Sequence, residues 1–417
     1  MGVLSLANDA LHQTILPELP GGLIPIEEWR LPETSVHRSI KGAVRNAWGQ
    51  LRAGIAPDNE ACDSLDDLPV LSQLQLERFA PDRDYARMAM LLLESVEESA
   101  ADNPVTFLVA PPFSGIHKAL QVLADDTHGA SRRLITPPDN LLLSAGDARA
   151  WWDACDLTQP WVIPELSAFW LRHRSGLELI RELLKRVAAG RAGEGLVGCA
   201  SWCWQFWSHC LPDGRFQALT PAPMHGELLG HWLNDLASRR NRQGVVARMS
   251  DSGLWVLPAA PDQLDEGQKA ASLLRDLAAL SRGIPGVALA IWQKALRARP
   301  EEEQQTRDRQ DDHHLATRPA CWVAPLEKLS LPSMPVTVGR GAALTLHALL
   351  LHDALNEDRL ELVTGLPGHE LALVLNRLRR ADLVAFHEAE ASWRVTPLGY
   401  PAIRRQLQSD GFPVDPF

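Results

Sequence analysis

Three absences narrow the classes of protein to which this 417-residue chain can belong. No window reaches the roughly 18 uninterrupted apolar residues that a membrane-spanning helix needs, so integral membrane insertion is not expected. Residues 1–20 lack the basic start and the continuous apolar core of a signal peptide, which indicates a cytoplasmic protein. Acidic residues outnumber basic ones, and the resulting net charge of −11 disfavours nucleic-acid binding over the surface of the protein as a whole.

Metal-binding patterns are also scarce. The six cysteines have no paired C-x-x-C spacing and are interpreted as reduced thiols. Cys199, Cys203 and Cys210 cluster within twelve residues, but small apolar residues along a strand and a helix explain them better than a metal site. Asp311 to His314 lie in a highly charged run that favours a solvated loop. We therefore expect no metal centre.

Short apolar strands alternate with helix-like segments in the first half of the chain. A helix is expected at 84–100, and the clearest of the intervening helices at 177–189. The apolar runs predict strands at 105–110, 133–136, 161–164, 196–200 and 216–220. Such alternation implies an α/β fold with a mostly parallel sheet and helices on both faces.

Beyond residue 220 the pattern becomes helical. Helices are expected at 225–240, 265–281 and 285–299, followed by a charged linker. The last segment predicts three helices at 342–355, 360–364 and 369–381, and two strands at 383–387 and 392–396. Helices followed by a hairpin in this order are typical of a winged helix.

The turn after the strand at 105–110 has the outline of a phosphate-binding loop. In such a loop, G-x-x-x-x-G-K-[ST], backbone N–H groups wrap the phosphates and the Lys reaches the terminal ones. Here Ser114 and Gly115 keep the small residues of the turn. Ile116 and His117, however, stand at the Lys and Ser/Thr positions, and Lys118 comes late in the motif.

The order of these motifs resembles the AAA+ and STAND branches of the P-loop NTPases over residues 75–300. The resemblance implies that Glu165 is the catalytic Glu, although Pro164 replaces the Asp that organises Mg²⁺. It also implies that Ser201 senses the γ-phosphate and that Pro285 belongs to the G-x-P turn of a lid over the adenine. From the residues alone, Glu165 is better interpreted as a cap of the segment that follows it, Leu166 to Leu171.

The resemblance suggests a division of the chain into five parts. These are an N-terminal extension (1–75), an NTPase-like α/β core (76–224), a helical lid (225–300), a linker (301–340) and a winged helix (341–417).

Two further clusters have alternative interpretations. Arg172 and Arg174 flank His173 and could supply an arginine to the nucleotide of a neighbouring subunit in a homo-oligomer, or form a solvated face. Trp202 and Trp204 would share one face of an extended segment, either packing beneath the lid or stacking on a partner.

The missing loop lysine decides between the functions. Its loss removes a charge-assisted contact worth roughly 1.5–3 kcal/mol to a triphosphate. We therefore predict a pseudo-ATPase scaffold or regulator that binds a protein partner and needs no cofactor. The alternative is an ATP-driven switch that binds ATP and Mg²⁺ in an atypical loop. A DNA-binding regulator is less favoured, because ten acidic residues accompany eight Arg and no Lys from residue 340 onward.

Overall fold

The computed structural model describes residues 18–32, 68–99, 104–125, 132–210, 216–240, 245–257, 271–298, 319–335 and 339–417. The chain divides into two compact units, the first formed by residues 1–30, 84–222 and 331–417, the second by 31–83 and 223–330. The charged linker from 299 to 314, including Asp311 to His314, lies outside the described residues.

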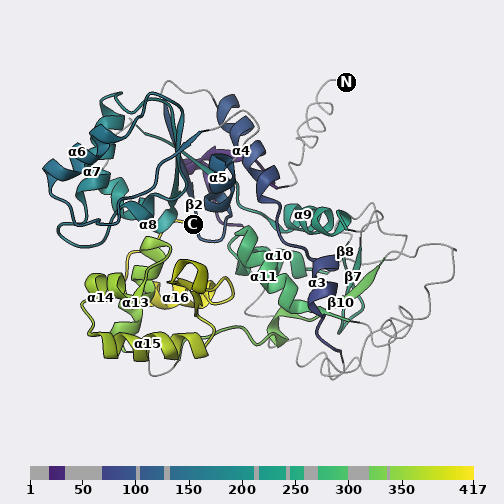
Figure 1. Ribbon diagram of the computed structural model, residues 1–417. Helices are drawn as coiled ribbons and strands as arrows, with labels where there is room; N and C mark the ends of the chain where they lie inside the picture. The colour runs from purple at the N-terminus through teal and green to yellow at the C-terminus, as the bar shows by residue number, and fades with distance from the viewer. Residues whose placement is uncertain are drawn as a thin grey trace, which may run out of the picture. The chain divides into compact units, whose positions relative to one another are not determined.

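A six-stranded sheet is the centre of the first unit (Figure 1), and its spatial order is β1-β6-β2-β5-β4-β3. Only β1 is antiparallel to its neighbour. The strands are β1 (Leu23–Pro25), β2 (Val105–Ala110), β3 (Arg133–Leu134), β4 (Trp161–Ile163), β5 (Gly195–Ala200) and β6 (Gln217–Pro221). The five parallel strands confirm the mostly parallel sheet predicted from the sequence.

Helices cover this sheet. They are α4 (Tyr85–Glu98), α5 (Ile116–Asp125), α6 (Ala145–Ala154), α7 (Glu178–Ala188) and α8 (Ser201–Trp207), with the 3₁₀ turns η2 (Ile26–Glu28), η4 (Leu166–Phe169) and η5 (Ser208–Cys210). Because side chains alternate along a strand, β2 places side chains on both faces of the sheet. Leu108 and Ala110 join a buried cluster with α4 and α5. Phe107 instead packs on Trp204 of α8, with ring centroids 5.4 Å apart.

The tryptophan pair lies in a helix rather than in the predicted extended segment. β5 ends at Ala200, and α8 starts at the next residue. Residues two apart on a helix point to nearly opposite sides, since each residue turns by about 100°. Trp204 therefore covers the sheet, whereas the Nε1 of Trp202 donates to Tyr400 Oη at 3.3 Å.

Residues 339–417, here called the C-terminal module, belong to the first unit. The order of elements is the predicted one: α13 (Arg340–His352), α14 (Glu357–Thr364), α15 (Gly368–Arg380), β11 (Val384–His387), η9 (Glu388–Glu390), β12 (Ser392–Val395) and α16 (Tyr400–Ser409). Asn356 caps the start of α14, and Gly365 ends it in the left-handed conformation. α13 contacts both η4 and α8 of the core, and its last eight residues are all buried. Figure 1 shows α13 next to α8, with the C-terminus close by.

The second unit contains a sheet that the sequence analysis missed. Its helices are α3 (Gln73–Phe79), α9 (Gly226–Ser238), α10 (Leu273–Leu280) and α11 (Pro285–Ala295), with the turn η8 (Leu326–Lys328). Its strands, in the order β8-β7-β10-β9, are β7 (Val246–Met249), β8 (Trp255–Leu257), β9 (Leu296–Arg297) and β10 (Ala320–Val323). The prediction that residues 225–299 contain helices alone was therefore wrong, since β7, β8 and β9 lie within this range. These strands are two to four residues long, too short for a period of two to stand out.

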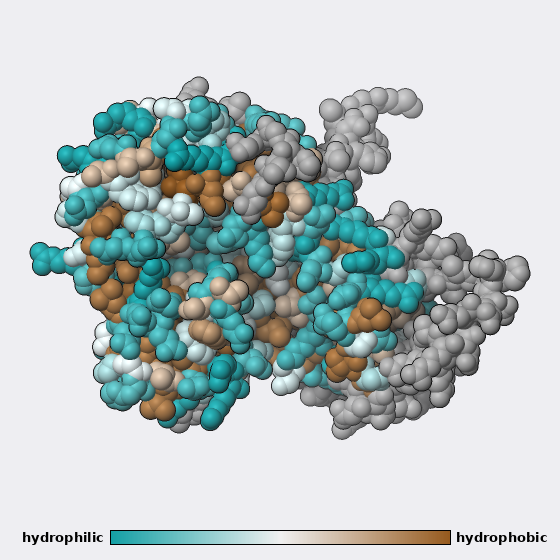
Figure 2. Space-filling view, in the orientation of Figure 1, coloured by the Kyte–Doolittle hydropathy of each residue, from teal (hydrophilic) through white to brown (hydrophobic). Residues whose placement is uncertain are grey.

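The surface carries no broad apolar area on the face shown in Figure 2, where hydrophobic colour is scattered among hydrophilic residues. Within the described part of the chain, no helix has the length and apolar character needed to cross a bilayer.

Candidate functional site

The sheet of the first unit has a point where successive connections leave in opposite directions. After β2 the chain crosses to β3 at one edge, whereas after β5 it crosses back to β6 on the other side of β2. In open α/β sheets, ligands bind outside the carboxyl ends of the strands at such a point. The residues that follow β2, β4 and β5 are therefore the candidates for a functional site.

The turn after β2 is compact and closed by its own hydrogen bonds. Ser114 donates its N–H to the carbonyl of Pro111 at 3.2 Å, and its hydroxyl accepts the N–H of Ile116 at 3.4 Å. Phe113 and Gly115 both have a positive φ, of 67° and 91°. Gly115 tolerates this conformation, whereas Phe113 adopts it at a cost.

Lys118 does not reach the turn. Its Nζ lies 5.1 Å from the centre of the Tyr85 ring on α4. An ammonium over an aromatic face is a favourable contact in its own right. The late lysine of the motif therefore serves the packing of α5 on α4 and is not directed at a ligand after β2.

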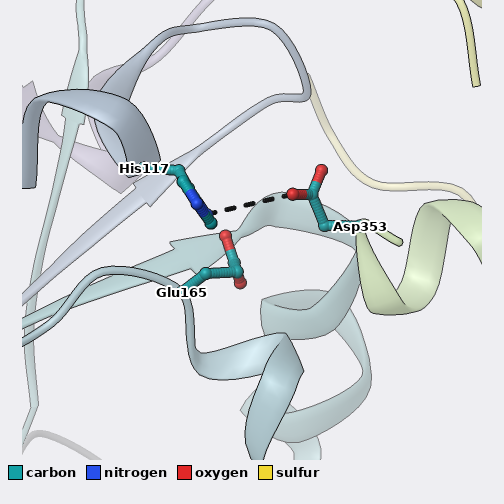
Figure 3. Close-up of side chains that lie close together, drawn as sticks. All are labelled: His117, Glu165 and Asp353. Carbon is teal, nitrogen blue, oxygen red and sulfur yellow. Dashed lines mark ion pairs between the residues drawn. The ribbon is translucent and has the colours of Figure 1, made fainter. Parts of the chain in front are cut away.

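Three polar side chains from distant parts of the sequence meet at this end of the sheet (Figure 3). His117 is on the first turn of α5, Glu165 follows β4 after one residue, and Asp353 follows α13 directly. One side-chain atom of each lies within 4.8 Å of the other two. His117 Nδ1 and Asp353 Oδ2 are 4.0 Å apart.

Glu165 is fixed by the ends of two elements. Its Oε1 accepts the N–H of Ser167 at 2.9 Å, which caps η4, and the N–H of Ala200 at 3.0 Å, at the end of β5. The side chain is buried, and burial together with the negative charge of Asp353 raises the pKa of Glu165 to about 8. The capping role considered from the sequence is thus present, and it coexists with a place in the cluster.

Two effects shift the pKa of His117 in opposite directions. Burial lowers the pKa of its imidazole, and the carboxylate of Asp353 acts in the opposite direction. Its Nδ1 is buried and has no hydrogen-bond partner among the described residues. Asp353 itself has a φ of 59° and a ψ of −32° and is the central residue of a γ-turn, in which the N–H of Ala354 donates to the carbonyl of His352 at 2.6 Å; this turn is rare and strained.

A pocket of about 210 Å³ opens beside the three side chains. Its wall also includes Arg359 and Arg394, and the Nη2 of Arg394 bonds to Glu390 at 2.7 Å. The volume is below the roughly 300 Å³ at which pockets for drug-sized ligands begin. The space suits an ion with a small ligand better than a whole nucleotide.

Ser201 is engaged by the C-terminal module. Its hydroxyl donates to the carboxylate of Asp415, which is also paired with the guanidinium of Arg404. A second Arg404 nitrogen bonds to the main-chain oxygen of Asp415 at 2.5 Å. Tyr400 packs edge-on against Phe113 of the turn, at 5.9 Å between ring centres. The end of the chain therefore covers both the turn after β2 and the end of β5.

Arg172 is also directed inward. Its Nη1 lies 3.2 Å from His347 Nδ1, and its Nη2 donates to the carbonyl of Val363 at 3.4 Å. Both partners are in the C-terminal module. The sequence predicted that Arg172 would either contact the nucleotide of a neighbouring subunit or face solvent. The Arg172 side chain does neither, because it contacts the C-terminal module of its own chain.

The residues present do not fit a bound triphosphate and Mg²⁺. Pro111 and Pro112 have no N–H to donate to a phosphate, and Lys118 is turned to Tyr85. The hydroxyl of Ser201 is already bonded to a carboxylate. A second carboxylate, that of Asp353, faces His117 at the Ser/Thr position of the motif.

Of the site residues predicted from the sequence, only Glu165 belongs to the cluster with His117 and Asp353. Ser114 caps α5, Ser201 binds Asp415, and Pro285 starts α11 in the second unit. The sequence interpretation treated His117 only as a lost ligand, and it missed Asp353. An acidic residue directly after an apolar helix was the one available signal for Asp353.

Comparisons with known proteins give little further guidance. No family model matches the chain, and no curated protein does. Among solved structures, the ORC2 protein of Aeropyrum pernix, determined as ADPNP–ADP complexes, is 13% identical, with 92% of this chain and 96% of that chain covered and a TM-score of 0.33. Similarity at this level leaves fold and function to be argued from the chain's own residues.

Proposed function

We propose that this protein is a catalytically degenerate member of the P-loop NTPase-like folds, a pseudo-ATPase that acts as a scaffold or regulator. In this proposal the C-terminal module is a winged helix that covers the former phosphate site. The observation that carries the proposal is the bond from Ser201 to Asp415. A residue at the position that would contact a phosphate is bonded instead to a carboxylate of the same chain.

The topology supports the fold assignment. The strand that carries the turn, β2, lies between β5 and β6, and the turn leads directly into α5. The helices and the two-stranded hairpin of the C-terminal module support the winged-helix assignment.

Electrostatics support the loss of nucleotide binding. Asp353 lies near the start of α5, and Asp415 lies at the end of β5. A phosphate entering beside His117 would meet the carboxylate of Asp353 in a partly buried setting, where Coulomb repulsion is weakly screened, whereas the charge of Asp415 is compensated by Arg404. Lys118, the late lysine of the motif, is turned to α4 and does not offset this repulsion.

A protein partner is favoured over DNA by the surface of the C-terminal module. Leu373 on α15 is 58% exposed and Phe386 on β11 is 41% exposed. Leu373 shares a face of α15 with Arg377 and Arg380, since the spacing is i, i+4 and i+7. An exposed apolar side chain among arginines suits a protein contact, whereas Glu388 and Glu390 next to the hairpin would repel DNA phosphates.

Equilibrium binding of fluorescently labelled ATP to the full chain, with Mg²⁺ present, tests the proposal. We expect no saturable binding in the micromolar range. Micromolar binding that is abolished by Gly115→Asp would overturn the proposal and favour the ATP-driven switch. The exposed Gly190→Asp, outside the site, is the matched control for the introduced charge.

A binding assay with duplex DNA tests the alternative that the protein is a DNA-binding regulator. We expect weak binding with no dependence on Arg377, Arg379 and Arg380. Tight, steeply salt-dependent binding that is lost when these three become Ala would assign the module to DNA instead.

A further inference from the structure

We infer that His117, Glu165 and Asp353 form a binding site for one divalent transition-metal ion of the zinc class, joining the α/β core to the C-terminal module. The inference does not depend on the proposed function, since no ligand in this set requires a nucleotide. It also departs from the expectation of no metal centre that the sequence favoured.

The separations are those of a site that closes slightly around an ion. Zinc lies about 2.0–2.2 Å from nitrogen and oxygen ligands, so two ligands of a tetrahedral ion lie roughly 3.4 Å apart. His117 Nδ1 and Asp353 Oδ2 are 4.0 Å apart. The full set lies within 4.8 Å, so side-chain rotations that bring the ligand atoms roughly 0.6–1.4 Å closer complete the geometry. Figure 3 shows the imidazole of His117 and the carboxyl groups of Glu165 and Asp353 directed toward one another.

The ligand types select the class of metal. Mg²⁺ prefers oxygen ligands alone and retains several waters. An imidazole with two carboxylates suits Zn²⁺, Mn²⁺ or Fe²⁺ better, and Zn²⁺ binds such sites more tightly than the other two. Three protein ligands beside an open pocket leave a further position for water or a small anion.

Two observations separate this cluster from an ordinary group of surface charges. The buried Nδ1 of His117 has no hydrogen-bond partner within the described ranges, a situation that costs free energy unless something binds the atom. Glu165 is 8% exposed and is oriented by the N–H groups of Ser167 and Ala200, as metal ligands are oriented by their own hydrogen bonds. One ligand is thus preoriented, and the nitrogen of another has no hydrogen bond within the described ranges.

The consequence would be a metal-dependent link within the first unit. His117 and Glu165 come from the core, and Asp353 comes from the end of α13. Metal bound to all three would hold the C-terminal module against the sheet. Removing the metal would weaken this attachment without breaking a covalent bond.

Metal titration of the full chain tests the inference. The protein is dialysed against a chelator, and Zn²⁺ is added in competition with a chromophoric chelator. We expect one tight site per chain that excess Mg²⁺ does not displace. Co²⁺ in the same site should give the visible absorption of a low-coordinate centre with nitrogen and oxygen ligands.

Near-isosteric variants identify the ligands. His117→Gln and Asp353→Asn should each weaken Zn²⁺ binding at least about tenfold and alter the Co²⁺ spectrum. His369→Gln and Asp358→Asn change the same residue types at exposed positions and should leave both readouts unchanged. Circular dichroism of the metal-free proteins separates lost ligation from lost folding.

Three results would overturn the inference. They are a wild-type protein with no stoichiometric Zn²⁺ site, folded His117→Gln and Asp353→Asn proteins that bind Zn²⁺ as the controls do, and displacement of Zn²⁺ by Mg²⁺ at comparable concentration. None of these results bears on ATP binding, so the proposed function is tested separately.

Discussion

The hydroxyl of Ser201 donates a hydrogen bond to the carboxylate of Asp415, 214 residues further along the chain. Arg404 pairs with the same carboxylate, and all three residues are buried. The residue that follows the central strand β5 is thereby connected to the segment after α16. This bond also places a carboxylate of the chain itself at the carboxyl ends of the parallel strands, where α/β proteins commonly bind ligands.

Removal of the Asp415 carboxylate should be costly. In Asp415→Ala the guanidinium of Arg404 stays buried without its partner, and such losses are worth about 3–5 kcal/mol. Ser201→Ala removes one hydrogen bond to the charged carboxylate and should lower the free energy of unfolding by about 1.5–3 kcal/mol, less than Asp415→Ala. Urea unfolding of the full chain, followed by tryptophan fluorescence, measures both.

The exposed Asp410 provides a control for Asp415. It accepts a bond from Gln406 Nε2 at 2.9 Å on the surface of the same segment. Asp410→Ala should change the free energy of unfolding by less than about 0.5 kcal/mol. Equal urea midpoints for Asp415→Ala and Asp410→Ala would contradict the structural role of the Asp415 pair.

Gly198→Ala should disturb the strand junction that positions Glu165. A Cβ at Gly198 would overlap the carbonyl oxygen of Pro164 and come within 2.7 Å of Leu120 Cδ1. The backbone of β4 cannot rotate away as a flexible side chain could, so we expect a loss of about 1–3 kcal/mol or more. Thermal or urea unfolding measures the loss.

Gly146→Ala is the matched control for this substitution. Its added Cβ would contact only Ser144 Oγ, at 3.7 Å, near the start of α6. Since Ala favours helix by up to about 1 kcal/mol over Gly, this variant should be neutral or more stable. A Gly198→Ala protein as stable as Gly146→Ala would show that β4 and β5 can separate at their ends.

The sequence predicts the centre of the first sheet well because β2, β4 and β5 are buried along their whole length, whereas the half-exposed β1 at the edge was missed. Parallel strands of this kind appear as short apolar runs, and the expected strand at 105–110 matches β2 residue for residue. The second sheet has no such signal. There β7 pairs with β10, and Val246 faces Ala320 across more than seventy residues of sequence.

The candidate site was only partly predictable for a related reason. Glu165 follows a strand that the apolar pattern reveals, so its place at the end of the sheet could be inferred. Asp353 and Asp415 reach the same end only because α13 and the last residues pack on the core. Local patterning carries no information about such contacts, since they depend on how separate elements dock.

Lys118→Ala should have little effect on either stability or nucleotide binding. The Nζ contacts the Tyr85 ring at 5.1 Å and the side chain is exposed, so about 0.5–1 kcal/mol is at stake. Lys185→Ala, an exposed lysine on α7, is the control. Binding of labelled ATP to the wild type but not to Lys118→Ala would contradict this interpretation. It would mean that Lys118 moves away from Tyr85 on α4 and contacts the phosphates at the turn after β2.

Stability should fall with acid through His347. This residue of α13 is buried, and burial together with the positive charge of Arg172 lowers its pKa to about 4 from an ordinary value of 6.5. Because the folded state binds the proton more weakly than the unfolded chain, the neutral form stabilises folding above pH 6.5. As the pH falls from 6.5 to about 4, this contribution declines by about 1.4 kcal/mol per pH unit, about 3 kcal/mol in total.

The difference between two proteins isolates this contribution from other titrating groups. His347→Asn cannot take up the proton, so its free energy of unfolding should fall less steeply than that of the wild type between pH 6.5 and pH 4. The wild type should be the more stable protein near neutrality, and the two curves should converge in acid. His369→Asn, at an exposed position of α15, controls for the loss of one histidine. Parallel curves for the wild type and His347→Asn would mean that His347 is accessible to protons in the folded protein, so that α13 is not docked on the core as tightly as its buried residues indicate.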